Sequence, residues 1–283
     1  MNKQKRVAFY LGNIITVNKY DVSLNAYIET IDKSKKNYYE PFIQLLIKTT
    51  NDKKKFNYVF GDNNISQHPT TILKSRGRGC NNGVILRCLD FNRHWNNYYN
   101  KPKDIDFDDK INKVIWRGTT TGKLNQPASR FELVTKYYNK YPNIDVGFSH
   151  ICQGKNDFKK YVKGKINVTD MLKYKYIVSV EGNDKDCGLN WKLNSNSVIL
   201  MAKPRITTWL METTLLPDVH YVLLKDDYSD LKEKYIWCEK NKDKCKEIIK
   251  NANKFMHQFS NEKKEQEIEE AVINKYFALT NIF

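Results

Sequence analysis

The sequence lacks the features that place a chain in a membrane or in a disulfide-stabilised class of proteins. No apolar run approaches the roughly 20 residues that a membrane helix requires, and the opening segment has no uninterrupted apolar core of the signal-peptide type. The six cysteines form no CxxC pair and show no histidine spacing typical of a zinc site. We therefore expect a soluble, reduced, cytoplasmic protein.

Arginine is scarce, although the chain is strongly basic. Only eight of its 48 basic residues are arginines, and the formal net charge is +16. The lysines are scattered among asparagines and tyrosines, which is typical of solvated faces. No helix-turn-helix, zinc-finger or RNP-type motif accompanies the charge, so we do not expect nucleic acid as a partner. The net charge alone suggests a peripheral contact with an anionic membrane, and it leaves the oligomeric state open.

Apolar runs rich in β-branched residues alternate with segments of helical spacing, and there is no internal repeat or proline- or glycine-rich linker. This alternation predicts an α/β fold with parallel sheets. The expected strands are 6–11, 56–60, 83–88, 113–115, 144–148, 176–180, 198–201 and 219–224. The expected helices include 39–48, 129–140, 186–196 and 227–240.

The length of 283 residues suffices for two domains of about 100 to 150 residues each. The polar stretch 96–113, which contains Pro102 and several aspartates, is the best boundary. We predict a first domain at 1–105, a second at 106–258 and a C-terminal helix at 259–283.

Residues 169–231 carry the strongest functional signal. The predicted strand 176–180 is followed at once by Glu181, Gly182, Asn183 and Asp184. Ligands of open α/β sheets gather at the carboxyl ends of strands, and a glycine there lets the backbone approach closely. A carboxylate, an amide and free N–H groups before a helix suit sugar hydroxyls or a diphosphate. Periodicity alone favours an ordinary polar turn between two strands.

Four consecutive blocks in this segment resemble the carboxyl-terminal half of glycosyltransferase family 90. The blocks are KYKYIVSVEGND at 173–184, GLNWKLNSNSVILM at 188–201, TTWLMETTLLPDVHYV at 207–222 and KDDYSDL at 225–231. The family includes fungal capsule-associated xylosyltransferases, animal protein O-glucosyltransferases and bacterial lipopolysaccharide core glycosyltransferases. Agreement of several blocks in order is more specific than a single glycine pattern.

The resemblance implies a donor site in the second domain. The turn at Trp116, Arg117 and Gly118 resembles the family's donor-binding turn, and Arg130 resembles its downstream arginine. A guanidinium is always charged and binds phosphate oxygens in pairs. Arg130 also fits the first turn of a helix capped by Ser129, an alternative that stays open. The predicted donor-binding residues are Arg117, Gly118, Thr119, Arg130, Glu181, Gly182, Asn183, Asp184, Asn196, Ser197 and Glu212.

Weaker blocks upstream resemble the amino-terminal half of the bacterial members. Inverting transfer needs a carboxylate that takes the proton of the acceptor hydroxyl. An aspartate of the first domain has this role in animal relatives, so we predict Asp62 as the base. The sequence Gly-Asp-Asn-Asn is also an ordinary turn, which remains the alternative. The predicted acceptor-side residues are Lys74, Arg76, Arg93 and His94.

The resemblance implies a GT-B-like fold, in which two Rossmann-like domains face each other across a cleft and the C-terminal helix crosses back to the first domain. It implies an inverting glycosyltransferase of glycan biosynthesis that moves glucose or xylose from a UDP-sugar to a hydroxyl of a glycan or lipopolysaccharide-like acceptor. Enzymes of this fold generally stabilise the leaving diphosphate with basic side chains, so we expect no cofactor and no metal. The alternatives are a non-catalytic protein that binds sugar nucleotides or glycans, and a basic nucleic-acid-binding protein.

Overall fold

The computed structural model describes residues 1–16, 24–62, 68–77 and 79–280. The chain divides into two compact units. Unit 1 comprises Met1–Asn96, Arg205–Glu212 and Gln258–Phe283, and unit 2 comprises Asn97–Pro204 and Thr213–His257. Each unit therefore combines segments that lie far apart in the sequence.

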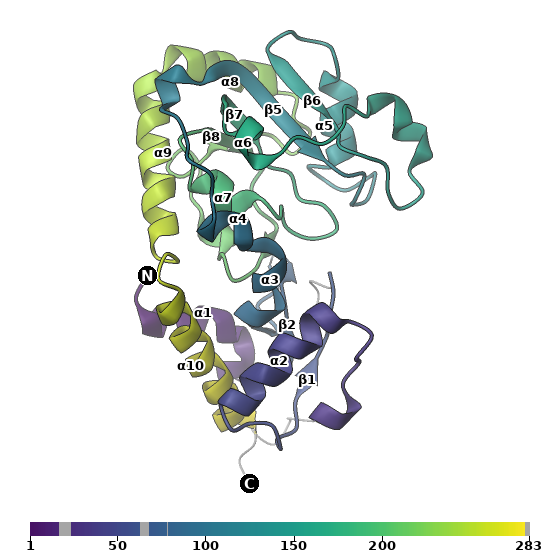
Figure 1. Ribbon diagram of the computed structural model, residues 1–283, viewed down its shortest axis with the longest axis vertical. Coiled ribbons are helices and arrows are strands. Elements are labelled where there is room, and N and C mark those ends of the chain that lie inside the picture. Colours follow the sequence, from purple (N-terminus) through teal and green to yellow (C-terminus); the bar gives the residue numbers. More distant parts are fainter. Residues whose placement is uncertain (17–23, 63–67, 78, 281–283) are drawn as a thin grey trace. The chain divides into compact units, whose positions relative to one another are not determined.

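Unit 2 is built on a five-stranded parallel sheet with the strand order β10-β8-β7-β5-β6 (Figure 1). Its strands are β5 (Ile111–Gly118), β6 (Ile144–Phe148), β7 (Tyr174–Val178), β8 (Val198–Met201) and β10 (Val222–Leu223). All four residues of β8 and the last four of β7 are buried, as expected for central strands covered on both faces.

Several helices of unit 2 carry apolar residues that pack in one core with the strands of the sheet. The helices of this unit are α5 (Arg130–Tyr137), α6 (Val168–Met171), α7 (Leu189–Leu193), α8 (Leu231–Lys240) and α9 (Lys242–His257), with 3-10 turns η5 (Phe107–Asp109) and η6 (Asn156–Tyr161). The helix α5 begins where predicted, because the Ser129 hydroxyl accepts a hydrogen bond from the backbone N–H of Glu132. Its residues Phe131, Leu133 and Val134 are buried in the same apolar core as β5 and β6.

Unit 1 contains a three-stranded parallel sheet with the order β1-β2-β4 and an antiparallel pair, β3 with β9. The strands are β1 (Asn57–Tyr58), β2 (Thr71–Leu73), β3 (Arg76–Gly77), β4 (Val84–Ile85) and β9 (Ile206–Thr207). The helices are α1 (Lys3–Leu11), α2 (Lys36–Lys48), α3 (Phe91–His94) and α10 (Glu262–Thr280). The 3-10 turns of unit 1 are η1 (Gly12–Thr16), η3 (Ile28–Thr30) and η4 (Arg87–Leu89). The helix α4 (Asn96–Tyr99) and the 3-10 turn η7 (Glu212–Thr214) each begin at the last residue of a unit 1 segment and continue into unit 2.

A buried polar cluster joins three segments of unit 1. The Arg6 guanidinium of α1 forms an ion pair with Glu265 of α10, and both side chains are 1% exposed. The indole N–H of Trp209 donates to Glu265 at 2.6 Å, and the ring of Tyr10 stacks on Trp209 with centroids 3.8 Å apart. Helices α1 and α10 and the segment around Trp209 therefore form one packed body, which Figure 1 shows for the two helices.

The mixed α/β class with parallel sheets is confirmed. The expected strand at 6–11 is wrong, because this segment forms α1. The Asn2 side chain caps the helix by accepting from the backbone N–H of Lys5, and Arg6, Tyr10 and Leu11 are buried at helical spacing. Among the described residues, no helix combines the length and apolar character needed to cross a bilayer.

Candidate functional site

Two loops meet at the carboxyl edge of the unit 2 sheet. One follows β5 and the other follows β7, and these strands are parallel neighbours, so both loops leave the same edge. The backbone N–H of Gly122 donates to the side-chain oxygen of Asn183 at 2.9 Å. The amide of Gln126 lies 3.5 Å from the carbonyl oxygen of Gly182. Asn183 and Gly182, both predicted donor residues, are thereby linked to the loop after β5.

Arg130, at the start of α5, binds both loops. Its guanidinium donates to the carbonyl oxygens of Thr119 at 3.1 Å, Glu181 at 3.2 Å and Val180 at 3.3 Å, and to the Thr121 hydroxyl at 2.7 Å. All these acceptors are neutral. No carboxylate of the described residues forms an ion pair with Arg130. Burial lowers the pKa of Arg130, and the nearby Asp186 carboxylate acts in the opposite direction without forming an ion pair with it.

Gly182 is required by the close packing of the two loops. A Cβ atom at this position would lie 2.6 Å from the Thr121 hydroxyl oxygen and 2.8 Å from Nη2 of Arg130. Real Cβ atoms do not approach other heavy atoms so closely. The glycine therefore allows the loop after β7 to close over the guanidinium.

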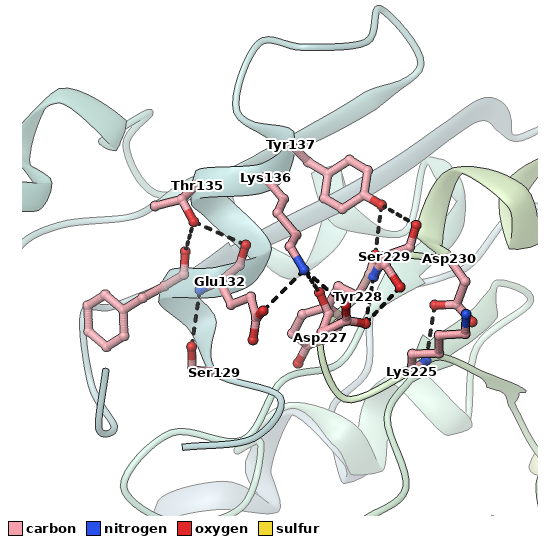
Figure 2. A network of polar contacts seen from close by, with 11 residues as sticks. Ser129, Glu132, Thr135, Lys136, Tyr137, Lys225, Asp227, Tyr228, Ser229 and Asp230 are labelled. Atoms are coloured by element: carbon pink, nitrogen blue, oxygen red, sulfur yellow. Dashed lines mark hydrogen bonds and ion pairs between the residues drawn. The ribbon is translucent and has the colours of Figure 1, made fainter. Parts of the chain in front are cut away.

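The first turn of α5 is fixed by the loop that precedes α8 (Figure 2). The Tyr228 hydroxyl donates to the carbonyl oxygen of Ala128 at 2.9 Å. The Tyr137 hydroxyl donates to the carbonyl oxygen of Tyr228 at 2.7 Å, as Figure 2 shows. Lys136 points toward the same loop and forms an ion pair of 3.2 Å with Asp227. These contacts determine where α5 starts, and hence where Arg130 lies.

Asp186 stabilises the loop after β7, and it was not among the site residues predicted from the sequence. Its carboxylate accepts from the Ser179 hydroxyl at 2.7 Å and from the backbone N–H of Gly188 at 2.9 Å, and it forms an ion pair with Lys192. Burial acts to raise the pKa of Asp186, but Lys192 and these hydrogen bonds bring it below its ordinary value. The aspartate two residues before a glycine is a turn signal that could have identified it.

The predicted base and three of the predicted acceptor-side residues gather in unit 1. The Asp62 carboxylate, 37% exposed, accepts from the buried ammonium of Lys74 at 2.7 Å. Burial acts to raise the pKa of Asp62, but Lys74, Arg93 and His94 together lower it. Asp62 is therefore an ionised and partly accessible carboxylate in a basic environment.

Residues 91–282 match the family model described as Glycosyl transferase family 90. The chain belongs to glycosyltransferase family 90. The resemblance seen in the sequence blocks is thus confirmed, and the chain is a glycosyltransferase.

Named relatives of this family 90 chain include two glucosyltransferases. This chain is 34% identical over 243 residues to "O-glucosyltransferase LpsA" of Dichelobacter nodosus, and the match covers 86% of this chain and 72% of that protein. It is 28% identical over 151 residues to "Protein O-glucosyltransferase 2" of Danio rerio, covering 53% of this chain and 29% of that protein. A third relative, "Uncharacterized protein 179R" of Invertebrate iridescent virus 6, is 39% identical over 92 residues, covering 30% of this chain and 8% of that protein.

In this family 90 chain, the two arginines predicted to share the diphosphate are not brought together. Successive residues of a strand point to opposite faces, so Trp116 and Arg117 diverge. The Arg130 guanidinium lies 5.9 Å from the Trp116 ring centroid. Arg117 instead binds both carboxylate oxygens of Asp145, at 2.9 and 2.8 Å. Burial acts to raise the pKa of Asp145, but Lys163 and Arg117 lower it.

Two other predicted donor residues of the family 90 chain, Asn196 and Ser197, lie away from the two loops, whereas Gly118 and Asp184 belong to their surroundings. Asn196 and Ser197 precede β8 and therefore lie at the amino edge of the sheet, where the Ser197 hydroxyl donates to the carbonyl oxygen of Tyr174 at 2.7 Å. Gly118, the last residue of β5, lies against the Trp116 ring. The carbonyl oxygen of Asp184 accepts from the N–H of Gly182 at 2.8 Å, which tightens the loop after β7.

Two predicted residues have clear packing partners within unit 1. Glu212 was expected in the second domain, but it belongs to unit 1 and accepts from the backbone N–H and the hydroxyl of Thr208 at 2.6 and 2.8 Å. Arg76 donates to the carbonyl oxygen of Phe9 at 2.6 Å, and burial lowers its pKa to about 10. Within the described ranges, no group of three or more His, Cys, Asp or Glu side chains is placed to hold a metal ion.

Proposed function

We propose that this glycosyltransferase moves glucose from UDP-glucose to a hydroxyl of a glycan, of lipopolysaccharide type, with inversion. The observation that carries the proposal is the Arg130 cation, which has only neutral partners and lies between the loops after β5 and β7. The choice of glucose is supported by the names of two relatives, both of which are O-glucosyltransferases.

The leaving diphosphate is proposed to bind at Arg130. Breaking the bond between the sugar and the diphosphate leaves negative charge on the phosphate oxygens, and a fixed cation stabilises this charge more in the transition state than in the ground state. The two loops pack closely at Gly122 and Gly182, which keeps the guanidinium fixed in place. No metal is required in this proposal, because the guanidinium supplies the positive charge.

Asp62 is proposed to act as the general base. The acceptor oxygen attacks the anomeric carbon, the bond to the UDP oxygen breaks, and the acceptor proton passes to the Asp62 carboxylate. One oxygen of the carboxylate is held by Lys74, while the partly exposed side chain leaves the other available. A single displacement at the anomeric carbon inverts its configuration.

The proposed reaction needs both units, because Asp62 lies in unit 1 and Arg130 in unit 2. We propose that they adopt the GT-B arrangement, with a Rossmann-like acceptor-side domain and a Rossmann-like donor domain. The C-terminal helix α10 belongs to unit 1 together with α1, and the proposed acceptor-side domain includes it.

Proton NMR of the product tests this proposal. The protein is incubated with UDP-α-glucose and a lipopolysaccharide core oligosaccharide, and the coupling constant of the new anomeric proton is measured. A β-linked glucose, formed at the same rate with and without EDTA, is the expected result. An α-linked product would contradict inversion, and a rate abolished by EDTA would contradict a metal-free mechanism.

A further inference from the structure

A pocket opens at the amino edge of the unit 2 sheet. It has a volume of about 560 Å³, and its lining includes Lys113, Asn139, Lys140, Tyr141, Asp145 and Lys163. Lys113 and Gly118 are five residues apart in β5, and a strand rises about 3.3 Å per residue, so roughly 17 Å separate this pocket from the carboxyl edge. The pocket is therefore distinct from the loops that hold Arg130.

The pocket has an excess of positive charge. Among the described residues that line it, Asp145 alone carries a carboxylate, which already forms ion pairs with Arg117 at 2.8 Å and Lys163 at 2.7 Å. Lys113 and Lys140 form no ion pair with any carboxylate that the structure describes. With Arg117 included, four cations face one carboxylate. Such an excess favours an anionic ligand, because each ammonium gains more from a phosphate than from water alone.

The remaining lining groups suit the hydroxyls and ring of a sugar. The Asp145 carboxylate and the Asn139 amide are hydrogen-bonding partners for hydroxyl groups, and Tyr141 and Tyr174 contribute aromatic surface. A volume of about 560 Å³ is within the range of small-molecule pockets. We propose that this pocket binds a phosphomonoester carried by a sugar. The concave shape favours such a ligand over a lipid headgroup in a flat bilayer, although both present the same phosphate chemistry.

Isothermal titration calorimetry with glucose 6-phosphate tests the proposal, with glucose and inorganic phosphate as comparison ligands. Binding is measured in the presence of saturating UDP, so that the proposed donor site is filled. Wild-type protein is expected to bind glucose 6-phosphate more tightly than either comparison ligand. The double variant Lys113→Gln/Lys140→Gln is expected to bind it at least roughly tenfold more weakly, because two charge-assisted contacts are lost.

Lys244→Gln is the matched control, because Lys244 is an exposed lysine of the same unit and forms an ion pair with Glu247 of its own helix. It should bind glucose 6-phosphate as the wild type does, and UDP should bind all variants equally. No binding by the wild type, unchanged binding by the double variant, or equal affinity for inorganic phosphate would overturn the proposal. Lysine-dependent binding to phosphatidylglycerol vesicles, without binding to glucose 6-phosphate, would also overturn it and indicate a lipid headgroup.

Discussion

At the scale of single residues, the environment of Asp62 determines the chemistry that this carboxylate can perform. The Lys74 ammonium is almost fully buried and lies 2.7 Å from the carboxylate, so the ionised form of Asp62 is favoured. A carboxylate with a lowered pKa is a weaker base, but it is fully deprotonated at neutral pH. This suits a reaction in which the proton is transferred only as the acceptor oxygen attacks.

Asp62→Asn is expected to reduce kcat by about 10² to 10⁴, because the amide cannot take the acceptor proton. Affinity for UDP should be unchanged, since Asp62 belongs to unit 1 and the proposed diphosphate site to unit 2. Steady-state kinetics and a thermal shift with UDP measure the two effects. Asp52→Asn, in a turn of the same unit, is the control and should keep full activity. Full activity of Asp62→Asn would remove the base from the mechanism.

Lys74→Met is expected to shift the acid limb of the kcat/KM profile to higher pH. The folded-state pKa of Asp62 is lowered, so its carboxylate stays ionised below the ordinary aspartate value of about 3.9. Removal of the Lys74 cation raises that pKa, and activity is then lost at a higher pH as the solution is acidified. Lys74→Arg keeps the charge and should retain the wild-type limb. An acid limb at the same pH in wild type, Lys74→Met and Lys74→Arg would show that Lys74 does not lower the pKa of Asp62.

At the scale of elements, the two loops after β5 and β7 form a single structure around Arg130. Arg130 binds carbonyl oxygens of both loops, and Gly122 binds Asn183 across them. A change in one loop should therefore alter the position of the other.

Gly182→Ala is expected to weaken UDP binding by roughly tenfold to a hundredfold, because its Cβ would displace Thr121 and Arg130. Calorimetry with UDP measures this loss. Gly164→Ala is the control. Gly164 has a φ of +86°, so alanine costs about 1 kcal/mol of stability there, but the added Cβ meets no neighbouring atom. If both variants lose UDP affinity equally, the effect comes from stability and not from the loop contacts.

Ser129→Ala is expected to lower the free energy of unfolding by about 1 kcal/mol, since the N-cap of α5 is lost. Urea denaturation followed by circular dichroism measures the change. Ser149→Ala, at a position that caps no helix, is the comparison and should change the free energy of unfolding less. Equal losses in the two variants would contradict the capping role of Ser129.

The sequence predicted those elements whose signals are local. The strands at 144–148 and 198–201 coincide with β6 and β8, because each is a short segment that contains β-branched residues. The segment 6–11 was wrongly predicted as a strand, because its apolar residues fit the period of a strand as well as that of a helix. The helix cap at Asn2 lies outside this apolar segment.

The candidate site could be predicted only in part. Gly182, Asn183 and Arg130 were predicted as donor residues because strand ends and scarce arginines are visible in the sequence, and the structure places them in the two neighbouring loops. The pairing of Arg117 with Asp145 was not predicted, because it depends on the register of β5 and β6, which sets Ile115 beside Asp145. Such pairs require knowledge of which strands are neighbours.

At the scale of the whole molecule, the two units are not two continuous halves of the chain. The segment Arg205–Glu212 belongs to unit 1, although unit 2 residues precede and follow it. This segment supplies Trp209 to the buried cluster with Arg6 and Glu265. Composition and periodicity do not indicate that the chain returns to unit 1 for these residues. For this reason Glu212 was expected among the donor-binding residues of the second domain.

The central claim is that a UDP-sugar binds through its diphosphate to Arg130 without a metal. Calorimetric titration of UDP-glucose, with EDTA present, into wild-type protein and Arg130→Gln tests it most directly. We predict binding by the wild type that EDTA does not reduce, and binding by Arg130→Gln that is weaker by about 2 kcal/mol, or roughly thirtyfold. Lys244→Gln, which changes an exposed lysine of unit 2 that pairs with Glu247 of its own helix, should bind as the wild type does. No binding by the wild type, or equal affinity of wild type and Arg130→Gln, would contradict the claim.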